Sequence, residues 1–168
     1  MKKNGNIKRL TLRGNCIGPQ GAQALASMLE ENTCLESVSL EWNQMGNAGA
    51  LAMANALTKN HTLRSIDFRN NNIADEGAIA LATSMRLNTV VTSIDLRWNV
   101  IGDKGGLPFE DIIARVNTPV TVLLSGNVIS AQAMARLEGI SERRVELEEM
   151  QNYDIIGEAD AHVARRKG

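Results

Sequence analysis

The 168-residue sequence has few aromatic residues, few cysteines and few histidines. Aromatic residues make up 3% of the chain, so the core that its 43% hydrophobic content can build must be mainly aliphatic. The cysteines are Cys16 and Cys34, and the histidines are His61 and His162. This set is too small for a disulfide framework or a four-ligand zinc site, so we expect no metal and no other cofactor.

An excess of charge of one sign is also missing. Eighteen Lys and Arg residues oppose 19 Asp and Glu residues, which gives a net charge of -1. A protein that holds nucleic acid through phosphates normally has a basic excess, so we expect no nucleic-acid partner. No apolar run is long enough to span a bilayer, and Met1 is not followed by a signal-peptide core. We therefore expect no membrane association and a cytoplasmic location.

What the sequence does contain is a repeat of 28 residues. Each unit is marked by an asparagine, with apolar residues eight, five and three positions before it and two positions after it. Proline takes the first of these positions in the fifth unit. The asparagines are Asn15, Asn43, Asn71, Asn99 and Asn127. Six positions further on stand Gly21, Gly49, Gly77, Gly105 and, in the last unit, Ala133.

Each unit reads L-x-x-L-x-L-x-x-N-x-I followed by a helical half, and this pattern resembles the leucine-rich repeat. The length of the unit resembles the ribonuclease-inhibitor-like subfamily, which implies one short strand and one helix per repeat. We therefore predict an α/β fold: a right-handed solenoid of about five repeats over residues 1–140, with a parallel sheet on the concave face and helices on the convex face. The asparagines would satisfy buried peptide groups, and the glycines would serve the helix starts through their dihedral angles or through close packing.

The two ends of the chain depart from this pattern. Residues 141–168 leave the repeat, and we expect a capping helix followed by a flexible tail. The charged stretch 141–150 also suits the start of a coiled coil or a partner-binding helix. Only six residues precede Ile7, whereas a solenoid end normally needs a cap. This predicts a missing N-terminal segment, a missing partner or end-to-end self-association.

The outward positions of the predicted strands form three columns across the sheet. They contain Arg9, Ser37, Ser65, Ser93 and Thr121; Thr11, Ser39, Asp67, Asp95 and Leu123; and Arg13, Glu41, Arg69, Arg97 and Ser125. Because neighbouring strands lie about 4.8 Å apart, the second and third columns predict a mixed-charge cluster for partner binding. The alternative is that these charges only neutralise one another at the surface.

Trp42 and Trp98 each stand directly before a repeat asparagine, and Asn70 holds the equivalent position between them. Two strand spacings would place the indoles about 10 Å apart on one rim of the sheet. Tryptophan and arginine often carry the binding energy of protein interfaces, so this rim is the predicted hot spot. The alternative is that each indole packs flat on the adjacent turn.

No catalytic constellation emerges from the sequence. The serine column has no histidine near it in the repeat, and Gly102–Gly106 lacks the spacing of a phosphate loop. The predicted function is that of a non-enzymatic scaffold that binds another protein on the concave sheet and the tryptophan rim.

The segments Leu40–Asn43 and Leu96–Gly102 resemble repeats of cytoskeletal proteins in which leucine-rich repeats precede a long coiled coil, as at centrosomes and in cilia. That resemblance implies a cytoskeletal scaffold with a centrosomal, ciliary or flagellar location. Two alternatives remain open. One is a GTPase-activating protein of the Ran-activator type, which would use Arg13, Arg69 or Arg97. The other is a self-assembling structural solenoid.

Overall fold

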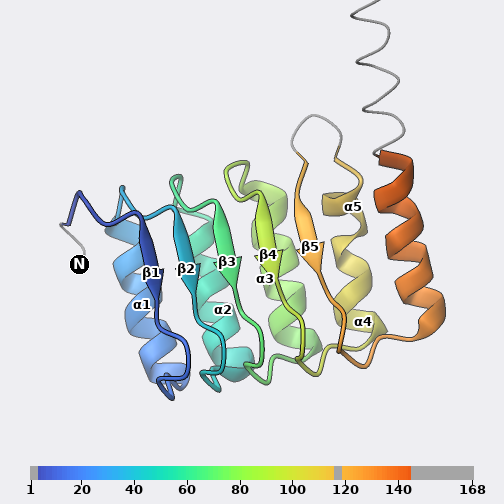
Figure 1. The fold of residues 1–168 in the computed structure, drawn as a ribbon, viewed down its shortest axis with the longest axis horizontal. Helices are drawn as coiled ribbons and strands as arrows, with labels where there is room; N and C mark the ends of the chain where they lie inside the picture. The colour runs from blue at the N-terminus through green and yellow to red at the C-terminus, as the bar shows by residue number, and fades with distance from the viewer. Residues whose placement is uncertain (1–3, 116–118, 145–168) are drawn as a thin grey trace, which may run out of the picture.

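The computed structural model describes residues 4–115 and 119–144. Within this part of the chain, five short parallel strands form one sheet in the order β1-β2-β3-β4-β5 (Figure 1). The strands are β1 (Arg9–Thr11), β2 (Ser37–Ser39), β3 (Ser65–Asp67), β4 (Ser93–Asp95) and β5 (Thr121–Leu123). Each strand residue pairs with the residue one repeat later, so the predicted columns that begin with Arg9 and Thr11 are present in the observed register. The third column, which begins with Arg13, lies just after the strand ends.

Helices cover one face of the sheet (Figure 1). The first three are α1 (Pro19–Glu31), α2 (Gly46–Leu57) and α3 (Asp75–Leu87). The fourth helical half is divided into α4 (Asp103–Gly106), the 3-10 helix η1 (Leu107–Phe109) and α5 (Glu110–Ile113). Two adjacent glycines and Pro108 explain the division, because both residue types disfavour the interior of an α-helix. The predicted α/β solenoid with a parallel sheet is confirmed.

The core lies between the strands and the helices and is almost entirely aliphatic. Alanines of α1, α2 and α3 are fully buried against the sheet, which lets helices and strands approach closely: Ala22, Ala50 and Ala78. Phe68 and Phe109 are the largest fully buried side chains. The low aromatic content is therefore sufficient to fill the interior.

The glycines at the helix starts are required by close packing and not by unusual dihedral angles. A Cβ atom on Gly105 would lie 2.6 Å from Oδ1 and 2.7 Å from Cα of Asp75. A Cβ atom on Gly49 would lie 2.9 Å from Cβ of Ala22. Of the two predicted explanations, close approach between consecutive repeats is the one that applies.

The repeat asparagines form a ladder of hydrogen bonds between turns. Asn99 accepts bonds from the backbone N–H groups of Asn71 and Ile73, both at 3.0 Å. Its Nδ2 donates to the carbonyl groups of Phe68 and Leu96 at 3.0 and 2.9 Å. An asparagine therefore completes the turn of the preceding repeat as well as its own, as predicted.

A second ladder stands at the other end of the strands and was not predicted, although its spacing is the same. It consists of Asn32, Asn60 and Asn88, which are 28 residues apart. Nδ2 of Asn60 donates to the carbonyl of Leu29 at 2.8 Å, and Nδ2 of Asn88 donates to that of Leu57 at 2.7 Å. Asn60 therefore links the C-terminal ends of α1 and α2, and Asn88 links those of α2 and α3.

The last described segment is a helix over residues 131–144, which continues past the predicted domain boundary at residue 140. The remainder of the predicted cap and tail, residues 145–168, lies outside the described residues. Among the helices that the structure describes, none combines the length and apolar character needed to cross a bilayer.

Candidate protein-binding surface

The predicted charge cluster is assembled on the exposed face of the sheet, and its first half is centred on Glu41. This carboxylate is buried, with 8% of its side chain exposed. Oε2 of Glu41 lies 3.0 Å from Nη2 of Arg69 and 3.3 Å from Nε of Arg13. Arg13 itself is 62% exposed, so it is the cationic group of the cluster that is most open to a partner.

The second half of the cluster joins Arg69 and Arg97 to two aspartates. Nη2 of Arg69 lies 2.8 Å from Oδ2 of Asp67, and Nε of Arg69 lies 3.4 Å from Oδ2 of Asp95. Nη2 of Arg97 lies 2.7 Å from Oδ2 of Asp95. Arg69 therefore bridges neighbouring strands, and three arginines balance three carboxylates.

Ionisation of the cluster follows from these contacts. Burial is the largest influence on the pKa of Asp67 and opposes its ionisation. The hydrogen bonds from Arg69 and Ser39 together outweigh burial and hold the pKa below its usual value of 3.8. Hydrogen bonding to Asp67 raises the pKa of Arg69, and hydrogen bonding to Asp95 raises that of Arg97. Asp67, Arg69 and Arg97 are therefore charged near neutral pH, and both arginines are held by carboxylates.

Trp42 and Trp98 lie in a column of left-handed backbone that the sequence analysis missed. The residue before each repeat asparagine has a positive φ: Gly14 (68°), Trp42 (61°), Asn70 (53°), Trp98 (57°) and Gly126 (74°). Glycine and asparagine adopt this conformation readily, but for a bulky side chain it is an outlier. The signal was visible as Gly14, Asn70 and Gly126, three residues typical of this conformation at one repeat position.

The two indoles are exposed but differ in their contacts. Trp98 is 61% exposed and lies over the next turn, where a Cβ on Gly126 would be 2.7 Å from Cε3 of the ring. Trp42 is 54% exposed, and its Nε1 donates to Oε1 of Glu41 at 3.1 Å. The flat packing considered as an alternative thus describes Trp98, while a bond to the charge cluster orients Trp42.

Two further exposed apolar side chains stand one position after the repeat asparagine. Val100 and Val128 are both exposed and occupy equivalent positions in the fourth and fifth repeats. The first three repeats hold Cys16, Gln44 and Asn72 at this position, so the repeat pattern gave no signal for the two valines. We use "tryptophan rim" for Trp42, Trp98, Val100 and Val128, and "charge cluster" for Arg13, Glu41, Asp67, Arg69, Asp95 and Arg97. Across residues 4–115 and 119–144, no group of His, Cys, Asp and Glu side chains could hold a metal ion.

This fold and this surface define an α/β solenoid of short repeats whose open sheet face carries charged and aromatic side chains. The chain belongs to the leucine-rich repeat family, because the family model described as "Leucine Rich repeat" matches residues 3–26, 31–54, 59–82 and 87–109. A comparison with curated protein sequences gives no match.

Two solved structures have the same fold as this chain. The structure titled "Leiomodin-1 Actin-Binding Site 2 (ABS2)" is 19% identical in sequence, with a TM-score of 0.67, and the alignment covers 93% of this chain and 91% of that one. The tropomodulin C-terminal domain of Caenorhabditis elegans is 15% identical, with a TM-score of 0.73 and coverage of 91% and 93%. At these identities the likeness concerns the fold alone.

Proposed function

We propose that this protein is a non-enzymatic binding module of the cytoskeleton, and that a partner protein contacts the tryptophan rim and the charge cluster. The observation that carries the proposal is the presence of two exposed tryptophans at positions of left-handed backbone. The left-handed conformation costs a residue with a side chain roughly 1–2 kcal/mol. Gly14, Asn70 and Gly126 occupy the same position at lower cost.

Burial of the two indoles in the fold offsets only part of this backbone cost. Both indoles remain more than half exposed, so much of their apolar area would be removed from water only by a partner. Tryptophan is the residue type most often found at the centre of protein interfaces, with arginine and tyrosine. The tryptophan rim is therefore better explained by binding than by folding.

The charge cluster supplies the polar part of the proposed interface. Its three arginines and three carboxylates balance each other, so a partner must offer both signs of charge in a matching order. Arg13 and Arg97 are the more exposed cations, while Glu41 is buried and contacts Arg13 and Arg69. This arrangement favours specificity over a general attraction to anions.

Actin is the first partner we propose. The leiomodin-1 domain is titled an actin-binding site and aligns with almost the whole of this chain, and the tropomodulin domain has the same extent. A cytoskeletal partner also agrees with the resemblance noted from the sequence. The centrosomal or ciliary location, the Ran-type activator and the self-assembling solenoid remain predictions.

The test is the double variant Trp42→Asn/Trp98→Asn. Asparagine retains the left-handed backbone, as Asn70 does at the same position, and removes both indoles. Leu87→Asn is the matched control, since Leu87 is an exposed apolar residue on α3, on the helical side of the molecule. Binding is measured by co-sedimentation with actin filaments and by fluorescence titration of monomeric actin.

We expect wild type and Leu87→Asn to bind alike and the double variant to bind at least about tenfold more weakly, which corresponds to roughly 1.4 kcal/mol. If the wild type binds neither form of actin, actin is the wrong partner. If the double variant binds actin as the wild type does, the proposed site is wrong and the partner is retained.

A further inference from the structure

The three arginines of the charge cluster are not equally paired with carboxylates. Nε and Nη2 of Arg69 donate to Oδ1 and Oδ2 of Asp67 at 3.0 and 2.8 Å. The same two atoms of Arg97 donate to Oδ1 and Oδ2 of Asp95 at 3.0 and 2.7 Å. Each of these two arginines therefore forms paired bonds with the aspartate two residues before it, which is a strong form of the arginine–carboxylate contact.

Arg13 holds the same repeat position but has no such aspartate. Thr11 stands two residues before it, at the position that Asp67 and Asp95 hold in later repeats. In the described part of the chain, the one ion pair of Arg13 joins its Nε to Glu41 at 3.3 Å, and the side chain of Arg13 is 62% exposed. Within that same part, no acceptor bonds to Nη1 or Nη2 of Arg13. These N–H groups are therefore open to an acceptor from another molecule.

Glu41 is not available to form paired bonds with Arg13. Its Oε2 also lies 3.0 Å from Nη2 of Arg69, and its Oε1 accepts a bond from Nε1 of Trp42 at 3.1 Å. Turning both carboxylate oxygens toward Arg13 would break these two contacts. Arg13 can therefore be paired as Arg69 is only if a further carboxylate comes from outside the cluster.

Open space for such a carboxylate lies beside Arg13. Gly14 is exposed, and a Cβ atom there would meet nothing within 4 Å. The last glycine of the same column, Gly126, is covered by the ring of Trp98. The backbone N–H of Gly14 donates to the carbonyl of Glu41 at 2.9 Å, so the exposed indole of Trp42 belongs to the adjacent turn. An open guanidinium, a free space and an apolar surface thus occur together.

We propose that Arg13 binds a carboxylate of the partner protein, from an aspartate or glutamate side chain, through paired bonds to Nη1 and Nη2. An apolar residue next to that carboxylate packs against Trp42. This rests on the proposed function, because it uses the same surface, and it adds the chemical group that the partner presents to the first repeat. Thr11 is the residue that keeps this place free, since an aspartate there would pair with Arg13 as Asp67 does with Arg69.

Two peptides that differ in one charge test the proposal: acetyl-Leu-Glu-Leu-amide and acetyl-Leu-Gln-Leu-amide. Each is titrated into the full-length chain, and the saturable shift of the indole Nε1–H signal of Trp42 in NMR spectra gives the Kd. We expect the wild type to bind the peptide with glutamate at least about tenfold more tightly than the peptide with glutamine. Arg13→Gln should remove this preference.

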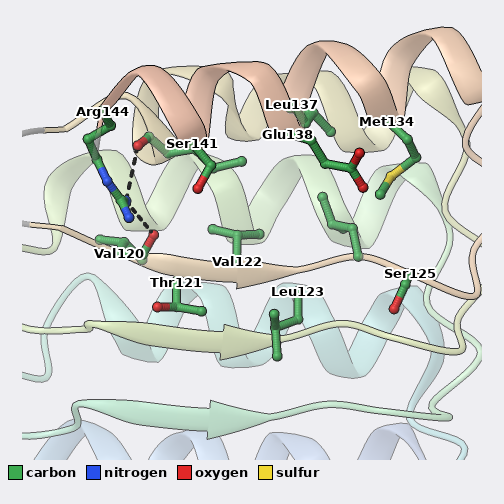
Figure 2. A pocket seen from close by; sticks show the side chains of 12 residues that line it. Val120, Thr121, Val122, Leu123, Ser125, Met134, Leu137, Glu138, Ser141 and Arg144 are labelled. Carbon is green, nitrogen blue, oxygen red and sulfur yellow. Dashed lines mark hydrogen bonds between the residues drawn. The ribbon is translucent and has the colours of Figure 1, made fainter. Parts of the chain in front are cut away.

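Thr11→Asp tests the same site without removing the arginine. It supplies the carboxylate that later repeats have, so Arg13 should be paired within the chain and the preference for the charged peptide should be lost. Thr121→Asp is the matched control and should keep the preference. Thr121 is exposed and lies on β5, at the opposite edge of the sheet from β1. Figure 2 shows it beside the groove of about 330 Å³ between β5 and the helix of residues 131–144.

The proposal is overturned if the wild type binds both peptides equally or shows no saturable shift with the charged one. It is also overturned if Arg13→Gln keeps the preference, or if Thr121→Asp loses it as Thr11→Asp does, since net charge would then be the cause.

Binding of the same variants to actin separates this proposal from the proposed function. If the peptide preference depends on Arg13 while the wild type does not bind actin, the carboxylate site is retained and actin is the wrong partner. If the wild type binds actin and shows no peptide preference, the proposed function is retained and the carboxylate site is wrong.

Discussion

Trp98 and Asn99 are neighbours in the chain but have opposite relations to the repeat. Asn99 is buried, and its position holds an asparagine in all five units because backbone groups of two turns depend on it. The position of Trp98 is exposed and holds glycine, tryptophan or asparagine, since the fold requires only a positive φ there. The comparison indicates that identity of residue between repeats reports on folding, and the proposed function rests on the departure from glycine or asparagine at Trp42 and Trp98.

Asn99→Ala should have the largest effect on stability. It leaves the buried N–H groups of Asn71 and Ile73 without their acceptor, and each such loss costs about 1–3 kcal/mol. We expect the free energy of unfolding in urea to fall by at least about 2 kcal/mol. Asn15→Ala, at the exposed end of the same ladder, should change it by less than about 0.5 kcal/mol. Similar losses in both variants would contradict the ladder.

Gly105→Ala tests a second position that the repeat dictates. The added methyl group would meet the backbone of Asp75 at 2.7 Å, so neighbouring turns must move apart. We expect a loss of about 1–3 kcal/mol in the free energy of unfolding. Gly139→Ala is the control, because a Cβ there meets nothing within 4 Å and alanine favours a helix. A loss of stability in Gly139→Ala that matched the loss in Gly105→Ala would exclude steric contact as the cause.

The charge cluster should contribute less to stability than these buried positions, and the pH dependence of the free energy of unfolding isolates the contribution of Asp67. Because the pKa of Asp67 is lowered in the folded protein, its stabilising effect is fully present above the unfolded value, near 3.8, and is lost as the pH falls through the lower, folded pKa. Asp67→Asn should reduce the free energy of unfolding by about 1 kcal/mol at neutral pH and flatten its decline below pH 4. If the free energy of unfolding of wild type and variant declined in parallel below pH 4, Asp67 would not be the source of the acid sensitivity.

The smallest effect is expected at the tryptophan rim. Trp42→Asn exchanges a strained residue for one that accepts left-handed backbone, while losing the bond to Glu41 and some apolar contact. We expect the free energy of unfolding to change by less than about 1 kcal/mol in either direction. A loss comparable with that of Asn99→Ala would place Trp42 among the residues that the fold requires, and would weaken the proposed binding role.

The period of 28 residues was sufficient to predict the strands, their register and the charge cluster, because every strand position has an equivalent in the next repeat. It did not reveal the column of left-handed backbone, because residue types such as those of Gly14 and Asn70 are the only sign of a positive φ in a sequence. Whether Arg69 and Asp67 bind each other or a partner depends on side-chain directions, which spacing does not determine. The groove beside β5 depends on how the last helix is placed, which no periodic signal reports.

The asparagine ladders have a consequence for how such a chain tolerates insertions and deletions. Asn43 bonds to Asn15 across an interval of 28 residues, and the bond from Asn71 to Asn99 spans the same interval. Removing or duplicating one whole interval within the array therefore brings an equivalent residue to every bond, whatever the starting point. Removing a single residue leaves all the bonds that cross the gap out of step. The length of the array can therefore change without loss of these bonds only by whole intervals of 28 residues.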